Sequence, residues 1–391
     1  MRGRGLAGCL VALLAVACSG PILANPPLVP DVPATPTATP TRPPDPQPIT
    51  FPDDDGPHDR LTEWWYLTGH LRAEDGRRFG FEAVVFRAER GSASLSWASH
   101  LALTDESGGR FLYGQRAVFG GAVDHSPRAT DGSGTGFSFL VPAVDPVTGL
   151  PAADAPWQLS GSGGRLAVAG ALSPTEAAHA GGAFGLDLEM TEDRPAVLHG
   201  EIGWIDLGAA GGSYYYSRTR LRTRGNLALD GRLLRVEGSA WFDHQWGDFI
   251  SVGGGGWDWF AVNLEDGTDL TVSLVRAADG SNPLIYGTLV DADGTVTNLG
   301  REAFEVVADP ARTWTSPTTR ATYPAGWTLR VAAEQLEIHL RPTVPDQELD
   351  TRPTTGVVYW EGSQVVSATR AGVPLGGQAY VELTGYGPAA R

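Results

Sequence analysis

Residues 240–260 read AWFDHQWGDFISVGGGGWDWF, and this stretch links two long series of predicted strands. It holds four of the twelve tryptophans of the chain, with Asp243, His244, Asp248 and Asp258 between them. Titratable groups packed among indole rings are the setting in which pKa values shift, and such settings mark functional sites. The stretch is therefore the first candidate for a site, and it does not name a reaction.

Side chains of an extended strand point alternately to its two faces. The alternation predicts two faces here: Trp241, Asp243 and Gln245 on one, and Phe242, His244 and Trp246 on the other. His244 then lies between two aromatic side chains, and Asp243 cannot reach it across the strand. We expect a carboxylate partner from another strand, with Asp258 as the candidate. The alternative is a structural histidine in an aromatic core.

Outside this stretch the chain alternates between short apolar segments and glycine-rich turns, which is typical of β-structure. Strands are predicted at 63–69, 79–87, 99–103, 111–119, 136–141, 166–171, 257–264, 269–276, 284–290, 327–331, 335–341, 356–361 and 379–386. One short helix is predicted at 174–180, with Ser173 as its N-cap. So little helix in 391 residues indicates an all-β chain of one or two antiparallel barrels or sandwiches. A coarse parallel between the halves favours two related barrels.

Charge and cysteine content exclude several classes of protein. The net charge of −16 argues against nucleic acid or an anionic membrane surface as the main partner. The only cysteines are Cys9 and Cys18, both near the N-terminus, so the folded part has no disulfide, thiol nucleophile or cysteine metal site.

The N-terminus is typical of an exported protein. Residues 1–18 contain two arginines, a short apolar run and small residues before Cys18, which is the pattern of a lipoprotein signal peptide. We expect Cys18 to be lipidated and to anchor the protein in the cell envelope; an ordinary secretory signal is the alternative. Residues 19–50 are rich in proline and threonine and predict a disordered tether. Domains are predicted at 51–247 and 248–391.

Two further clusters are open to functional and structural interpretations. The run Glu63-Trp64-Trp65-Tyr66 could line a ligand cavity or close a barrel end. An inward-facing Glu63 would need a partner, of which arginine is the natural one. In 214–220, alternation places Tyr214, Tyr216, Arg218 and Arg220 on one face, either toward a pocket or toward solvent.

Motifs of common catalytic sites are missing from the sequence. The histidines show no HExxH or His-x-His spacing, so no metal site is predicted. No GxSxG elbow, phosphate loop or dinucleotide fingerprint occurs, so neither a cofactor nor a hydrolase nucleophile is predicted.

Motifs spread from about residue 55 to 387 carry a family resemblance. They are Glu63-Trp64-Trp65-Tyr66-x-x-Gly69, Ser99-His100-x-Ala102-Leu103-Thr104-Asp105, Tyr215-Tyr216-Ser217, Val236-x-Gly238-x-Ala240-Trp241-Phe242-Asp243-His244-Gln245-Trp246-Gly247, Gly256-Trp257-Asp258-Trp259-Phe260, Tyr359-Trp360-Glu361-Gly362 and Tyr380-Val381-Glu382-Leu383-Thr384-Gly385-Tyr386. In this order they resemble the secreted lipocalin-like proteins related to carotenoid 1,2-hydratase (hydroxyneurosporene synthase). The resemblance implies two lipocalin-like antiparallel β-barrel domains packed together, and an apolar, isoprenoid- or lipid-like ligand.

The enzymes of that family add water to a C=C bond without a cofactor. Their His-x-Trp motif, implicated in catalysis, corresponds to His244 and Trp246. An acidic–aromatic pair is also implicated; Trp257 and Asp258 are approximate candidates, because the tyrosine of the family pattern has no clear counterpart here. Asp243 completes the catalytic candidates.

The leading hypothesis is an exported hydratase-like protein that binds an apolar molecule, and the alternative is a carrier or envelope binding protein without catalysis. The side chains expected to line the ligand site are Glu63, Trp64, Trp65, Tyr66, Tyr216, Arg218, Trp257 and Trp259. An enzyme requires His244 and a carboxylate to face one ligand-sized cavity, whereas a carrier requires only an apolar cavity. The sequence leaves the oligomeric state open.

Overall fold

The computed structural model describes residues 44–90, 95–127, 135–143, 155–208, 211–249 and 254–387. The predicted signal peptide, the lipidation site Cys18 and most of the predicted tether lie outside these residues. Within them, none of the helices has the length and apolar character needed to cross a membrane.

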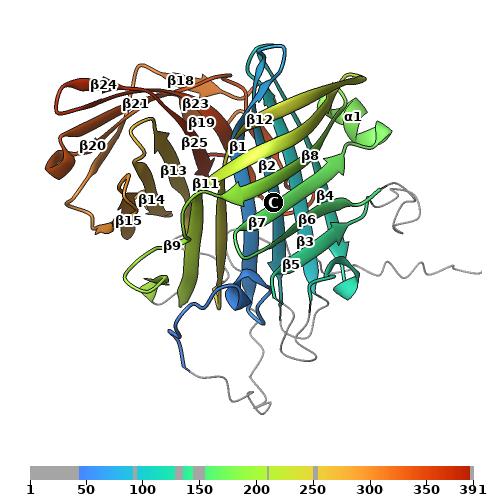
Figure 1. Ribbon diagram of the computed structural model, residues 1–391, viewed down its shortest axis with the longest axis horizontal. Coiled ribbons are helices and arrows are strands. Elements are labelled where there is room, and N and C mark those ends of the chain that lie inside the picture. The colour runs from blue at the N-terminus through green and yellow to red at the C-terminus, as the bar shows by residue number, and fades with distance from the viewer. Residues whose placement is uncertain are drawn as a thin grey trace, which may run out of the picture.

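The described residues form two large, curled antiparallel sheets that pack side by side (Figure 1). In the order in which they pair, the strands of the first sheet are β4 (Arg110–Phe119), β3 (Ser96–Asp105), β2 (Arg78–Ala88), β1 (Thr62–Ala73), β12 (Arg232–Gly247), β11 (Gly212–Leu229), β8 (Phe184–Glu192), β7 (Arg165–Ala171), β6 (Trp157–Ser162) and β5 (Phe137–Val141). Two short strands, β9 (Val197–Leu198) and β10 (Trp204–Asp206), also pair with β11.

The second sheet is formed by the last third of the chain. Its strands pair in the order β16 (Val296–Leu299), β15 (Leu284–Val290), β14 (Asp269–Ala277), β13 (Gly254–Leu264), β25 (Gly377–Thr384), β23 (Val358–Arg370), β21 (Leu336–Pro342), β20 (Trp327–Val331) and β17 (Glu305–Ala308). The short strands β22 (Glu348–Asp350) and β24 (Val373–Leu375) pair with β23. A separate two-stranded sheet is formed by β18 (Thr313–Thr315) and β19 (Thr322–Pro324). The predicted all-β class with two barrel-like sheets is confirmed.

Helix α1 (Pro174–Ala180) lies beside the first sheet and begins where the sequence predicts. The Ser173 hydroxyl accepts a hydrogen bond from the Glu176 amide, and the Glu176 carboxylate accepts one from the Ser173 amide. This reciprocal capping satisfies amide groups that the first turn of a helix leaves free. Gly181 ends the helix in the left-handed conformation, with φ of 75°.

Each sheet curls around its own apolar core, and a third apolar cluster lies between the sheets. The first core contains fully buried aromatic side chains, among them Trp65, Phe139 and Phe242, so aromatic rings fill the interior of the first sheet. The cluster between the sheets includes Tyr66 and Trp259. The alternation of side chains along each strand produces this arrangement. Successive side chains of a central strand point in turn into the core of their own sheet and into the seam, which is the region where the two sheets pack against each other.

Residues 44–61 cover one end of the first sheet. The Tyr214 hydroxyl accepts a hydrogen bond from the Gln47 amide at 2.6 Å, and Arg60 forms an ion pair with Asp45 at 2.6 Å. Asp55 is buried against the aromatic core. Residues 44–50, the last part of the predicted tether, are mostly exposed, and Ile49 packs against the first core.

Candidate functional site

Strand β12 divides the predicted site residues between two places. Phe242 and Trp246 belong to the core of the first sheet, and His244 contacts the rings of both. Asp243 and Gln245, on the opposite face, line a cavity between the two sheets. The predicted alternation of faces is therefore confirmed, and it separates His244 from the cavity.

His244 is fully buried, and its carboxylate partner is Glu63. His244 Nε2 lies 2.9 Å from Glu63 Oε1, and His244 Nδ1 lies 3.3 Å from the Tyr216 hydroxyl. The same oxygen, Glu63 Oε1, lies 2.7 Å from His58 Nδ1. The pairing of β1 with β12 sets Trp65 opposite His244, which brings the neighbouring Glu63 diagonally within reach. Two histidines thus take the place of the arginine expected beside Glu63.

The pKa values of the three side chains in this cluster are shifted in different directions. Burial lowers the pKa of His58, but Glu63 and Asp54 outweigh burial and raise it above the ordinary value. Burial raises the pKa of Glu63, but His58 and His244 outweigh it and lower it. Burial lowers the pKa of His244, more than Glu63 raises it. The directions of these shifts favour an ionised Glu63 between a protonated His58 and a neutral His244.

His58, Glu63 and His244 are also the described residues that could hold a metal ion, since one ligand atom of each lies within 4.8 Å of the others. Short-range motifs could not reveal this group, because its members lie in separate segments of the chain. In this structure His58 Nδ1 and His244 Nε2 both lie within hydrogen-bond distance of Glu63 Oε1, so these three side chains already have hydrogen-bond partners in one another.

Asp258 lies in a different place from His244. Its side chain points into the second sheet, where its carboxylate pairs with Arg276 and accepts a hydrogen bond from the Tyr386 hydroxyl at 3.1 Å. Neighbours Trp257 and Trp259 point the other way, into the cavity. The prediction that Asp258 is the partner of His244 is wrong, because the two strands belong to different sheets and the faces that carry these side chains point into separate cores.

Arg218 also points into the first sheet. It pairs with Asp55 at 2.7 Å and with Glu192, and its guanidinium lies over the ring of Phe51. The predicted face of Arg218 does not extend to Arg220, which pairs with Asp269 of the second sheet at 2.8 Å. A β-bulge between Arg218 and Leu221 shifts the register and redirects the later side chains.

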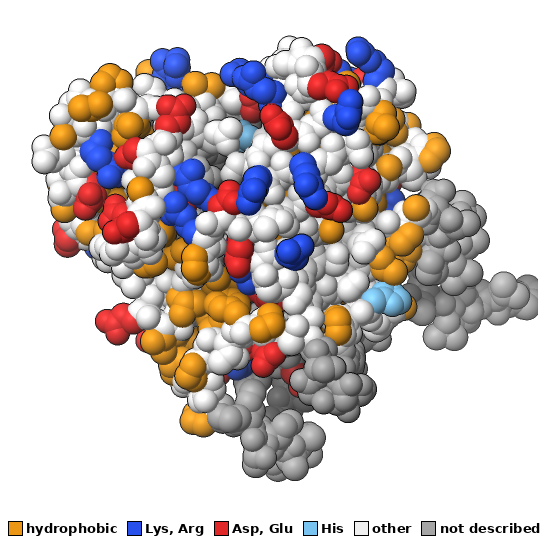
Figure 2. Space-filling model, viewed as in Figure 1, with side chains coloured by type: hydrophobic (Ala, Val, Ile, Leu, Met, Phe, Trp, Pro, Cys, Tyr) orange, Lys and Arg blue, Asp and Glu red, His pale blue; other side chains and the backbone are white. Residues whose placement is uncertain are grey.

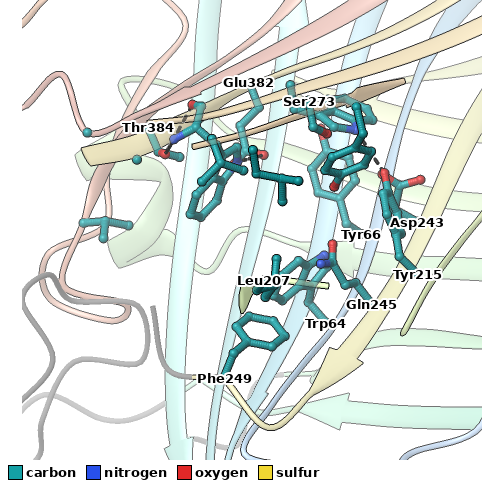
Figure 3. A pocket seen from close by; sticks show the side chains of 18 of the residues that line it. Trp64, Tyr66, Leu207, Tyr215, Asp243, Gln245, Phe249, Ser273, Glu382 and Thr384 are labelled. Atoms are coloured by element: carbon teal, nitrogen blue, oxygen red, sulfur yellow. Dashed lines mark hydrogen bonds between the residues drawn. The ribbon is translucent and has the colours of Figure 1, made fainter. Parts of the chain in front are cut away.

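The cavity between the sheets has a volume of about 160 Å³. Aromatic and aliphatic side chains form most of its wall, and several of these surround the space in Figure 3. The lining residues are Trp64, Tyr66, Phe86, Leu207, Tyr215, Asp243, Gln245, Phe249, Gly256, Trp257, Trp259, Ser273, Val275, Leu284, Tyr286, Val357, Glu382, Thr384 and Gly385. On the face drawn in Figure 2, apolar side chains gather over the seam between the two sheets.

Asp243 provides one acidic group of the cavity wall. Its carboxylate accepts hydrogen bonds from the Tyr215 hydroxyl at 2.6 Å, from Trp241 Nε1 at 2.7 Å and from the Ser217 hydroxyl. Burial raises the pKa of Asp243, and these three donors hold the rise to about 6. Asp243 is therefore mostly ionised at pH 7 and can accept a proton below it.

Glu382 of β25 provides the other acidic group and enters the cavity from the second sheet (Figure 3). Trp257 Nε1 donates a hydrogen bond to Glu382 Oε2 at 2.9 Å. Burial raises the pKa of Glu382 to about 7, with a further contribution from Asp243. The group is therefore about half protonated at neutral pH.

The predicted site residues fall into three places. Trp64, Tyr66, Asp243, Trp257 and Trp259 line the cavity. Glu63, Trp65, Tyr216, Arg218, His244 and Trp246 lie in the first core, and Asp258 lies in the second sheet. Sequence reasoning missed Glu382, although it lies within a quoted motif. Its alternation with Val381 and Leu383, both in the second core, could have indicated that it faces out of that core.

Comparisons with known proteins agree with this architecture. A family model described as AttH-like matches residues 42–386. The AttH-type protein NE1406 from Nitrosomonas europaea is 31% identical, with a TM-score of 0.69 over 87% of this chain and 98% of that one. No curated protein has a significantly similar sequence.

Two more distant structures share the fold. Kievitone hydratase from Nectria haematococca is 17% identical, with a TM-score of 0.59 over 82% of this chain and 88% of that one. CghA, in its structure with Sch210972, is 12% identical, with a TM-score of 0.54 over 84% of this chain and 89% of that one.

Proposed function

The chain belongs to the AttH-like family, and on that premise we propose that it is a cofactor-free hydratase acting in the cavity between the sheets. One observation carries the proposal: Asp243 and Glu382 both have raised pKa values and face one cavity lined by indoles. A carboxyl whose pKa is raised toward neutrality can hold or take up a proton near pH 7, which is what an acid or a base needs. That a relative of the same fold is named as a hydratase supports the reaction class.

Glu382 is the proposed acid. Its proton passes to one carbon of a C=C bond, and the adjacent carbon becomes a cation. The faces of Trp64, Trp257 and Trp259 stabilise that cation through their electron-rich surfaces. Water then bonds to the cation, and the proton that the bound water releases passes to Asp243. A positioned acid of this kind contributes roughly 10²- to 10⁴-fold to a rate.

The size of the cavity restricts the substrate. Its volume of about 160 Å³ is similar to that of an engineered cavity of about 150 Å³ that holds benzene. It is below the range of about 300–1,000 Å³ typical of sites that enclose a drug-sized ligand. We therefore propose that one ring, or one branched isoprenoid end, enters the cavity while the remainder of the molecule lies outside it.

Incorporation of labelled oxygen tests the proposal. The purified chain is incubated in H₂¹⁸O with an apolar extract of the native cell envelope, and products are analysed by mass spectrometry. The wild type is expected to yield a product heavier by one labelled water, and Glu382→Gln is expected to yield none. Glu337→Gln is the matched control, because Glu337 of β21 is partly exposed and does not line the cavity. Equal labelling by wild type and Glu382→Gln would exclude Glu382 as the acid.

A carrier without catalysis is the second candidate function, favoured by the apolar wall of the cavity. The structure of CghA with Sch210972 supports small-molecule binding by this fold. A carrier would bring the same molecule through purification in wild type, Asp243→Asn and Glu382→Gln, with no labelled product in any of them.

Export and anchoring through Cys18 belong to the same proposal and are supported by the N-terminal sequence. Metabolic labelling with a radioactive fatty acid is expected to mark the wild type and not Cys18→Ala. An unlabelled wild type found in the culture medium would indicate the secreted alternative.

A further inference from the structure

Three glutamates meet in the seam beside the cavity, and the proposed reaction uses only one of them. Glu361 of β23 and Glu382 of β25 stand directly opposite each other in the pairing of these strands. Glu82 of β2 approaches from the first sheet. Glu82 and Glu361 are 2% and 1% exposed, so bulk water does not solvate them.

The inner two glutamates have tyrosines as partners. The Tyr66 hydroxyl donates a hydrogen bond to Glu361 Oε1 at 2.6 Å, and the Tyr359 hydroxyl donates one to Glu82 Oε1 at 2.8 Å. The second oxygens, Glu82 Oε2 and Glu361 Oε2, are buried without a hydrogen-bond partner. Among the described residues, none of the ion pairs involves these three glutamates.

Three ionised carboxylates cannot coexist in this place. Like charges directly opposite each other on neighbouring strands are destabilising, and so is a buried charge without a counter-ion. Burial first, and then repulsion by Glu82 and Glu382, raise the pKa of Glu361. Burial, and less strongly Glu382, raise the pKa of Glu82. Protons on the inner carboxyls remove both penalties.

Other titratable groups face the same seam. Asp243 of β12 and Tyr380 of β25 contribute no positive charge. His100 of β3 has Nδ1 2.7 Å from the Tyr359 hydroxyl, and burial lowers its pKa to about 3, so it is neutral. At the edge of the seam, Glu106 Oε1 lies 3.6 Å from His70 Nδ1. Within the part of the chain that the structure describes, no group of the seam offers the inner glutamates a cation.

We propose that Glu361, backed by Glu82, is a proton store that reloads Glu382, and that Tyr66 connects this store to the cavity. The proposal rests on the proposed role of Glu382 as the acid. Tyr66 lines the cavity and bonds to Glu361, while Glu361 stands opposite Glu382. Glu361 touches no substrate and is a positioning residue.

The proton balance closes over one cycle. After Glu382 has given its proton to the substrate, the proton of Glu361 moves across the strand pair to Glu382. The hydrogen bond from Tyr66 stabilises the carboxylate then left on Glu361. Tyr66 passes its own proton to Glu361 and takes one from a cavity water, and the proton that Asp243 received from the attacking water returns to that cavity water. Glu361, Glu382, Tyr66 and Asp243 are then all restored.

Infrared titration of the ligand-free full-length chain tests the store. The C=O stretching band of protonated carboxyls is followed from pH 5 to pH 9 in wild type, Glu361→Gln and Glu382→Gln. Wild type is expected to retain part of this band at neutral pH, Glu361→Gln to lose one carboxyl from it, and Glu382→Gln to lose the component that titrates near pH 7. Glu337→Gln, at a partly exposed glutamate of β21, is expected to leave the band unchanged.

An unchanged band in Glu361→Gln, or no protonated carboxyl in wild type at neutral pH, would overturn the store. Tyr66→Phe provides a second test that does not alter charge: losing the hydrogen bond to Glu361 is expected to shift the frequency of one component, and an unshifted band counts against the proposal. The infrared measurement needs no substrate, so the two proposals can fail separately. If the band of protonated carboxyls is present but no labelled product forms, hydration at Glu382 is refuted and the protonated store is not. If labelled product forms but the band is absent, the store alone is refuted.

Discussion

Glu361 lies directly opposite Glu382, on the face of the second sheet that packs against the first. Repulsion between the two carboxylates and their burial make the seam between the sheets sensitive to pH. The stability of the folded protein is therefore expected to depend on pH.

The pH dependence of stability follows from the direction of the pKa shifts. The folded-state pKa values of Glu82 and Glu361 are raised above the ordinary 4.5. A carboxyl of this kind contributes fully to stability below pH 4.5, and its contribution falls as pH rises toward the folded-state value. Stability is therefore expected to decrease from pH 5 to pH 8, by about 1.4 kcal/mol for each unit of pKa shift.

Thermal unfolding of Glu361→Gln checks this stability prediction. A glutamine is neutral at every pH, so the melting temperature of the variant is expected to fall less steeply with pH than that of the wild type. Glu337→Gln should have the wild-type slope. Parallel slopes for wild type and Glu361→Gln would show that Glu361 is ionised in the folded protein.

The pH profile of turnover depends on Glu382 and Asp243. The acid requires a proton on Glu382, whose pKa is about 7, and the base requires an ionised Asp243, whose pKa is about 6. We expect kcat/KM for ¹⁸O incorporation to be highest between these values and to fall about tenfold per pH unit on either side. In Asp243→Asn the fall on the acidic side should disappear. A profile that still rises through pH 6 in this variant would assign the base to another group.

His244 is expected to contribute to stability more than to turnover. It is buried against Glu63 and does not line the cavity. His244→Ala creates a void and removes a donor from a buried carboxylate, so we expect the free energy of unfolding to fall by about 3–5 kcal/mol. His179→Ala, on the exposed helix α1, should change it by less than about 0.5 kcal/mol. Chemical denaturation measures both, and lost turnover with unchanged stability would return His244 to the catalytic candidates.

Local sequence patterns predicted much of the fold and little of the site. The alternation along 240–246 correctly assigned Asp243 and His244 to opposite faces, since side-chain direction is a property of one strand. The partners of His244 depend on which strands pair and on how a covering segment folds back, as Glu63 and His58 show. No local pattern encodes those contacts. The bulge after Arg218 likewise depends on register and reversed the prediction for Arg220.

The position of the cavity was the least predictable feature. A lipocalin-like resemblance directs attention to the interior of a barrel, but bulky side chains such as Trp65 and Phe242 fill the interior of the first sheet. The cavity forms where Trp64 and Trp257, from different sheets, leave space between them. This space depends on how the two sheets pack, so neither the segment around Trp64 nor the segment around Trp257 predicts it alone.

The cavity can be narrowed without disturbing either core. Leu284, at the start of β15, lines the cavity and is only partly buried, so Leu284→Trp is expected to occupy part of a volume of about 160 Å³ while the chain remains folded. Affinity for the neutral fluorescent probe N-phenyl-1-naphthylamine should fall at least about tenfold, which corresponds to about 1.4 kcal/mol.

Leu233→Trp is the matched control for this variant, because Leu233 is 71% exposed on β12 and does not line the cavity. It introduces the same indole and should leave the affinity for the probe unchanged. Fluorescence titration of wild type and both variants measures the difference, with circular dichroism spectra to compare their folding. Equal affinity in a folded Leu284→Trp would mean that the probe binds elsewhere, and the cavity between the sheets would lose its place as the ligand site.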